Sequence, residues 1–173
     1  GKTVQDARNG GSSGCVEVGA FGKENYNLTG YFNMPKMLEL VLNNGLDPRT
    51  GKQIVLQTGD PRRFASFDEL FAAYCKQLKH FIDIKVRGNQ VIERLYAEYM
   101  PAPFLSLLID DCTLTGKDYH NGGARYNTSY IQGVGLGTLT DCMTTLQYHV
   151  FEHKTFSMEE LLGALQDDFA GAE

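Results

Sequence analysis

Residues 66–100 carry the longest periodic pattern in the sequence, and they constrain the fold more than any other feature. Apolar side chains recur there with helical spacing, at Leu70, Phe71, Tyr74, Leu78, Phe81 and Ile82. Ser66 and Glu69 form a capping box at the start, and Pro101 stops the pattern at its end. We therefore expect one long amphipathic helix, with a weak point at Gly88-Asn89.

Shorter patterns on either side predict a mixed α/β chain. Asn33 caps an amphipathic helix that ends at Asn44-Gly45, and Ser157 with Glu160 starts a helix near the end of the chain. The other expected elements are a loop over 46–63 with a short strand at 54–56, a helix over 104–109, a buried turn and strand over 119–137, and a helix over 138–149. We find no internal repeat and no domain boundary, so the chain is predicted to be a single segment.

Composition and charge exclude several classes of protein. The 173 residues are 42% hydrophobic, the net charge is −5, and the basic residues form no runs, which argues against nucleic-acid and membrane-surface partners. Four widely spaced cysteines and no signal-like start favour reduced thiols in the cytoplasm. The chain begins without Met and has its sharpest motif only fifteen residues in, so we expect it to be part of a larger protein.

The glycine and histidine patterns in this sequence do not match the motifs of known nucleotide or metal sites. Gly133, Gly135 and Gly137 lack the spacing of a dinucleotide fingerprint. His149 and His153 have metal-ligand spacing but no third ligand, so we interpret them as ordinary polar side chains and expect no metal. Of the four cysteines, Cys75 and Cys142 lie in helical patterns that favour packing roles. The pattern around Cys112 favours no particular role.

Cys15 is different, because glycines flank it and a carboxylate follows at Glu17. In extended backbone, residues two apart point the same way, so a thiol and a carboxylate would face one small volume. The carboxylate would raise the thiol pKa, which disfavours a thiolate nucleophile. A neutral thiol that carries a hydrogen atom has no such requirement, and Glu17 would then be available for proton transfer.

Three long strings carry a resemblance to a known family: SSGCVEVGAFGKENYNLTGYFNMPKMLELVLNNGLDPRTGKQ, TGDPRRFASFDELFAAYCKQLKHFID and DDCTLTGKDYHNGGARYNTSYIQGVGLGTLTDC. They resemble the glycyl radical enzymes, which include pyruvate formate-lyase, over essentially the whole chain. The resemblance implies part of a ten-stranded α/β barrel, with the Cys15 loop reaching its centre. It also implies that Cys15 is the thiyl site and that Glu17 transfers a proton.

The same resemblance implies a dehydratase or lyase, because pyruvate formate-lyase has two adjacent cysteines where this chain has one. The string GKENYNLTGYFN is most similar to the branch that removes water from trans-4-hydroxy-L-proline, where Tyr31 matches a pocket tyrosine. Two alternatives stay open. One is another lyase or decarboxylase of the superfamily, acting on a diol, amino alcohol, sulfonate or arylacetate; the other is an inactive fragment.

The family stores its radical on a glycine in a C-terminal Arg-Val-x-Gly motif, which does not occur in this sequence. The resemblance therefore implies that residues 1–173 are one segment of the catalytic barrel domain, inactive alone. It further implies a radical S-adenosylmethionine activating enzyme as partner, a homodimer of the longer protein, and no cofactor bound to this chain.

Overall fold

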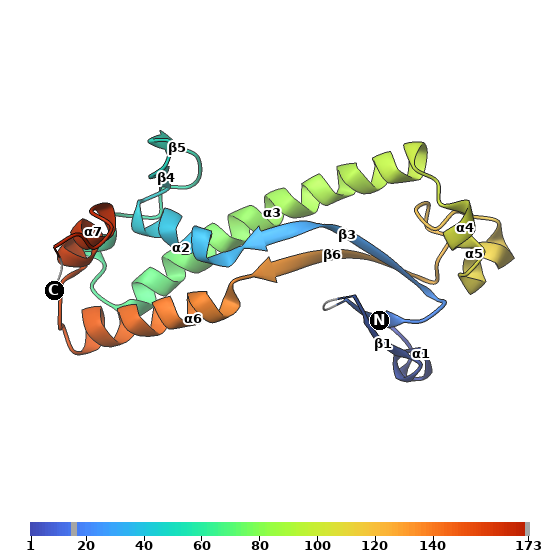
Figure 1. Ribbon diagram of the computed structural model, residues 1–173, viewed down its shortest axis with the longest axis horizontal. Helices are drawn as coiled ribbons and strands as arrows, with labels where there is room; N and C mark the ends of the chain where they lie inside the picture. Colours follow the sequence, from blue (N-terminus) through green and yellow to red (C-terminus); the bar gives the residue numbers. More distant parts are fainter. Residues whose placement is uncertain (15–16, 172–173) are drawn as a thin grey trace. The chain divides into compact units, whose positions relative to one another are not determined.

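The computed structural model of the chain describes residues 1–14 and 17–171 (Figure 1). The chain divides into two compact units, each built from two stretches of sequence. The first unit comprises Gly1–Tyr31 and Lys85–Gln132, and the second comprises Phe32–Ile84 and Gly133–Glu173.

The second unit is mainly helical. Its elements are α2 (Met34–Leu42), the first part of α3 (Phe67–Tyr99), α6 (Leu136–Thr145), the π-helical segment η2 (Leu146–Glu152), α7 (Met158–Gln166), the 3₁₀ helix η1 (Pro61–Arg63) and the short antiparallel pair β4 (Leu46–Asp47) and β5 (Lys52–Gln53). Its core is one cluster of apolar side chains from these helices, in which Leu40, Val41 and Leu70 are at most 1% exposed.

Local capping explains where two of these helices begin, as the sequence predicts. The side chain of Asn33 accepts a hydrogen bond from the backbone N–H of Lys36 at the start of α2. At α7, Ser157 and Glu160 form the complete capping box, with side-chain and backbone groups bonded in both directions. Both predictions are confirmed.

Two other predictions in this unit are wrong. The strand expected at 54–56 lies instead at Lys52–Gln53, where it pairs with Leu46–Asp47. Cys75 and Cys142 are exposed in this chain, not packed in the core. Each cysteine is one position away from a buried residue, Tyr74 and Met143, and one position is about 100° around a helix.

The first unit combines two pairs of strands with short helices. Its elements are α1 (Val4–Arg8), β1 (Gly10–Ser13), β2 (Glu17–Ala20), β3 (Glu24–Asn33), α4 (Pro103–Ser106), α5 (Asp110–Thr115), β6 (Tyr126–Val134) and the later part of α3. Strands β1 and β2 form an antiparallel hairpin. Strands β3 and β6, which lie mainly in this unit, run in the same direction as a parallel pair (Figure 1).

The long helix, the strand within 119–137 and the mixed α/β class are confirmed, and α3 continues through Gly88-Asn89 without a break. The described residues form three two-stranded sheets, so the ten-stranded barrel is not visible in this part of the protein.

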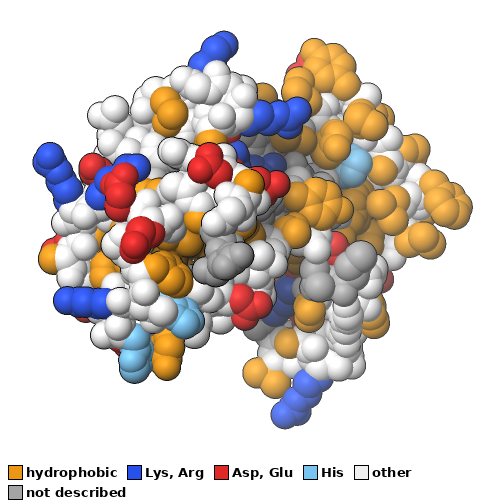
Figure 2. Space-filling model, turned by 60° about the vertical axis from the view of Figure 1, so that its left-hand side comes forward, with side chains coloured by type: hydrophobic (Ala, Val, Ile, Leu, Met, Phe, Trp, Pro, Cys, Tyr) orange, Lys and Arg blue, Asp and Glu red, His pale blue; other side chains and the backbone are white. Residues whose placement is uncertain are grey.

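Hydrophobic side chains are common on the surface of the first unit, at Val91, Tyr99, Met100, Phe104, Leu107, Leu108 and Leu114. Figure 2 shows side chains of this kind gathered on part of the surface. None of the helices in the described ranges has the length and apolar character needed to cross a membrane.

Candidate functional site

The β1–β2 hairpin flanks the Cys-x-Glu motif of residues 15–17. Its last strand pairing joins Ser13 to Glu17. Cys15 lies outside the described residues, as does Val16. Gly14 adopts the left-handed region at φ +65°, and a Cβ placed on it would lie 2.8 Å from Glu17 Oε2. The absence of a side chain at Gly14 therefore leaves room for the half-buried Glu17 carboxylate.

A second carboxylate, Glu24, lies fully buried behind this hairpin. Its Oε2 accepts a hydrogen bond from the backbone N–H of Ala20 at 2.8 Å and pairs with Lys2 Nζ at 2.7 Å. Its Oε1 accepts a hydrogen bond from the Thr128 hydroxyl at 2.8 Å. A buried carboxylate is stable only when its oxygens are paired and hydrogen-bonded, and Glu24 meets both conditions. It thereby joins β2 to β3 and β6.

Tyr130 on β6 contacts the same carboxylate and the backbone of β2. Its hydroxyl donates to the carbonyl oxygen of Val18 at 2.7 Å and lies 3.3 Å from Glu24 Oε1. Its ring stacks on Tyr26, with centroids 6.0 Å apart and planes 9° from parallel. Val18 directly follows Glu17, so this hydroxyl holds the backbone next to the motif carboxylate.

Burial and the neighbouring groups shift the pKa values of Glu24 and Tyr130 in opposite directions. Burial would raise the pKa of Glu24, but the bonds from Lys2, Ala20 N–H and Thr128 outweigh burial and hold that pKa below its ordinary value. Burial, followed by the charge of Glu24, raises the pKa of Tyr130 to about 12. At neutral pH Glu24 is therefore ionised, and Tyr130 is a neutral hydrogen-bond donor.

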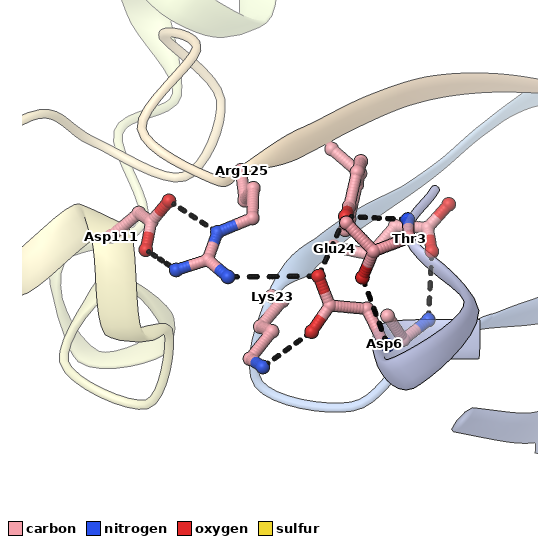
Figure 3. A network of polar contacts seen from close by, with 8 residues as sticks. Thr3, Asp6, Lys23, Glu24, Asp111 and Arg125 are labelled. Atoms are coloured by element: carbon pink, nitrogen blue, oxygen red, sulfur yellow. Dashed lines mark hydrogen bonds and ion pairs between the residues drawn. The ribbon is translucent and has the colours of Figure 1, made fainter. Parts of the chain in front are cut away.

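A second polar network fixes helix α1 (Figure 3). The buried Asp6 carboxylate accepts from Lys23 Nζ at 2.5 Å and from the Tyr126 hydroxyl at 2.6 Å. Arg125 Nη1 lies 3.6 Å from Asp6 Oδ2. The same guanidinium makes a bidentate pair with Asp111, in which Nη2 donates to Oδ1 at 2.9 Å and Nε donates to Oδ2 at 3.0 Å. The hydrogen bonds from Lys23 and Tyr126 hold the pKa of Asp6 well below its usual range. This network attaches the segment before the hairpin to β6 and α5.

Tyr31, the predicted pocket residue, lies near the end of β3 and is 67% exposed. It is on a different strand from Glu17, which starts β2. The structure of this chain therefore leaves its predicted role as a substrate contact untested.

Cys112, His149 and His153 are three further residues that the sequence brought into question. Cys112 is buried on α5, and burial raises the pKa of its thiol. His149 lies 3.2 Å from the Thr155 hydroxyl, and the His153 ring packs on Tyr148 with centroids 4.0 Å apart. Across residues 1–14 and 17–171, no cluster of three His, Cys, Asp or Glu side chains is suited to a metal ion.

Sequence reasoning missed Glu24 and Tyr130. Glu24 belongs to the polar string GKENYN, and nothing in that string distinguishes it from an exposed carboxylate. Its partner Tyr130 is 106 positions away in sequence. Residues two apart on a strand point to the same face, so the predicted strand would have placed Thr128 and Tyr130 side by side.

Comparison with known proteins decides the family. The Pyruvate formate lyase-like family model matches residues 1–173. This chain belongs to that family. It is 60% identical over 173 residues to trans-4-hydroxy-L-proline dehydratase of Clostridioides difficile, and 36% identical over 174 residues to (2S)-3-sulfopropanediol dehydratase of Klebsiella oxytoca. All of this chain is covered in both comparisons.

A solved structure agrees with the sequence comparison. The crystal structure of hydroxyproline dehydratase from Clostridioides difficile with trans-4-hydroxy-L-proline bound superposes with a TM-score of 0.94 over 99% of this chain, at 60% identity. This family member spans only about a fifth of its relatives: 22% of the C. difficile protein and 21% of the K. oxytoca protein.

Proposed function

We propose that this chain is a segment of the catalytic barrel domain of a glycyl radical dehydratase that eliminates water from trans-4-hydroxy-L-proline. The observation that carries the proposal is the 60% identity to trans-4-hydroxy-L-proline dehydratase over the whole chain. Cys15, Glu17 and Tyr31 are the residues of this chain that we assign to the reaction. The longer protein that contains them is called the parent hereafter.

The chemistry begins with a hydrogen atom. The Cys15 thiyl takes the hydrogen from the ring carbon next to nitrogen that also neighbours C4, so an S–H bond forms as a C–H bond breaks. The carbon radical is stabilised by the nitrogen lone pair. The C4–O bond then breaks, and the hydroxyl leaves as water with a proton from Glu17. Cys15 returns a hydrogen atom to C4, and the product is a pyrroline carboxylate.

The reaction is a net loss of water, so it consumes no oxidant or reductant. Nitrogen releases one proton as the ring C=N bond forms, which balances the proton that Glu17 gave to the leaving hydroxyl. Tyr31 would contact the bound substrate through its hydroxyl or its ring. A dry site protects the carbon radical from quenching.

We assign the source of the radical to the part of the parent that lies outside this chain. A glycyl radical in its C-terminal segment would supply the hydrogen abstraction that converts the Cys15 thiol to the thiyl. A radical S-adenosylmethionine enzyme would install that radical, and the parent would act as a homodimer. The segment alone would be inactive.

The test uses the full-length parent, activated anaerobically. Product formation is measured with trans-4-hydroxy-L-proline and with a panel of diols, amino alcohols, sulfonates and an arylacetate. Glu17→Gln keeps the size of the side chain but cannot give up a carboxylic proton, and it should lower water loss by at least about 100-fold. Turnover of another panel member instead would keep the superfamily chemistry and reject our substrate. No turnover of any member, with a glycyl radical present, would reject the proposed function.

A further inference from the structure

We infer that Tyr130, supported by Glu24, is a positioning residue that holds Glu17 in place through the backbone of Val18. The inference rests on the proposed role of Glu17, and it adds a residue 113 positions further along the chain to the site. Neither Tyr130 nor Glu24 needs to touch the substrate for this role.

The geometry of the hydroxyl carries the argument. The β1–β2 hairpin is only four residues long on each side, and an isolated two-stranded hairpin is marginally stable in water. Its second strand needs an external support to fix the direction of the Glu17 side chain. The 2.7 Å hydrogen bond from Tyr130 to the Val18 carbonyl supplies that support one residue from Glu17.

Glu24 supports the same strand at its other end. Its carboxylate accepts from Ala20 N–H, two residues after Val18, and its other oxygen lies beside the Tyr130 hydroxyl. Strand β2 is therefore held at two backbone groups that follow Glu17 in sequence, the Val18 carbonyl and the Ala20 N–H. Both are held by side chains of the β3–β6 pair. A group that handles a proton must stay in hydrogen-bond reach of it, and a displacement of about 1 Å costs on the order of 100-fold.

The chain offers a matched control for this hydroxyl. Tyr26 stacks on Tyr130, and its hydroxyl has no hydrogen-bond partner among the described residues. Tyr130→Phe and Tyr26→Phe each remove one hydroxyl from the same pair of stacked rings. Only Tyr130→Phe removes a bond to β2.

The experiment compares both variants with the wild-type parent. Hydrogen exchange of the peptide that spans 14–20 is measured by mass spectrometry, and kcat and KM are measured after activation. We expect exchange of the β2 amides to be about 3- to 10-fold faster in Tyr130→Phe, as for the loss of one hydrogen bond. We expect kcat to fall roughly tenfold or more with KM changed less than about twofold.

Tyr26→Phe should match the wild type in both measurements, and the glycyl radical yield should be the same in all three proteins. Unchanged exchange in Tyr130→Phe, or faster exchange with unchanged kcat, would overturn the inference. Equal losses in the two variants would overturn it as well. Kinetics are run on whichever panel substrate the wild type converts, and exchange needs no turnover, so a wrong substrate assignment does not imitate a failed inference.

Discussion

Gly19→Ala is the substitution for which the structure gives the sharpest expectation. Gly19 lies on β2, and a Cβ there would be 2.5 Å from the Tyr26 hydroxyl oxygen and 2.6 Å from Glu24 Oε2. Glu24 is held by its hydrogen bonds and Tyr26 by its stacked partner, so neither can move without loss. Gly19 has no left-handed backbone conformation, and the cost of the substitution is therefore steric.

The magnitude follows from two opposing effects. Overpacking at such a site costs about 1–3 kcal/mol. Alanine recovers roughly 0.5–1 kcal/mol, because it restricts the unfolded backbone more than glycine does. Because these two contacts are shorter than 3.0 Å, we take the overpacking cost from the upper half of its range. The net expectation is a local destabilisation of about 1–2.5 kcal/mol at the hairpin, which corresponds to roughly 5- to 70-fold faster opening.

The assay is peptide-level hydrogen exchange of the parent, with the peptide that covers 10–20 as readout. Gly88→Ala is the matched control, because no described atom lies within 4 Å of a Cβ at that position in helix α3. It should stabilise its helix by about 0.5–1 kcal/mol and slow local exchange. Unchanged exchange at 10–20 in Gly19→Ala, or faster exchange around 88 in the control, would refute the reasoning.

Three further predictions concern other parts of the chain. Hydrogen bonds from Lys36 and Thr50 lower the pKa of Asp47 to about 2 from an ordinary 3.8. The ionised Asp47 therefore stabilises the fold above about pH 4, and this stabilisation is lost as pH falls towards 2. In acid titrations the difference in free energy of unfolding between wild type and Asp47→Asn should shrink across that window, and a constant difference would contradict the prediction. Buried Cys112, whose thiol pKa is raised by burial, should resist iodoacetamide in the native protein and react in urea, and equal rates would count against its burial. Ser157→Ala should cost α7 about 1 kcal/mol, seen as roughly fivefold faster exchange of its first amides, and unchanged exchange would argue against the capping box.

Predictions from sequence succeeded where the determining contacts are local. The caps at Asn33 and Ser157 depend on residues three positions away, and the length of α3 follows from a pattern that continues to a proline. Cys75 shows the limit of such patterns, because it lies inside a correctly predicted helix but on its exposed side. A period of 3.6 residues identifies a helix more reliably than it assigns the residues at the edge of its apolar face.

The candidate site shows the same limit. The motif around Cys15 and Glu17 is recognisable from its composition and from its resemblance to a family. The contacts that hold strand β2 are not, because the partners of Glu24 are Lys2, Ala20 and Thr128, and Thr128 is 104 positions away in sequence. Contacts at that separation depend on how β3 and β6 pair, which no local pattern specifies.

The most direct test of the account is water loss from trans-4-hydroxy-L-proline by the anaerobically activated parent, measured in wild type and in Cys15→Ser. The serine hydroxyl cannot carry the hydrogen atom as the thiol does. The account predicts a pyrroline carboxylate product in wild type and none in Cys15→Ser, with the same glycyl radical yield in both. Product formation by Cys15→Ser would contradict the account, because the hydrogen transfer would then not pass through Cys15.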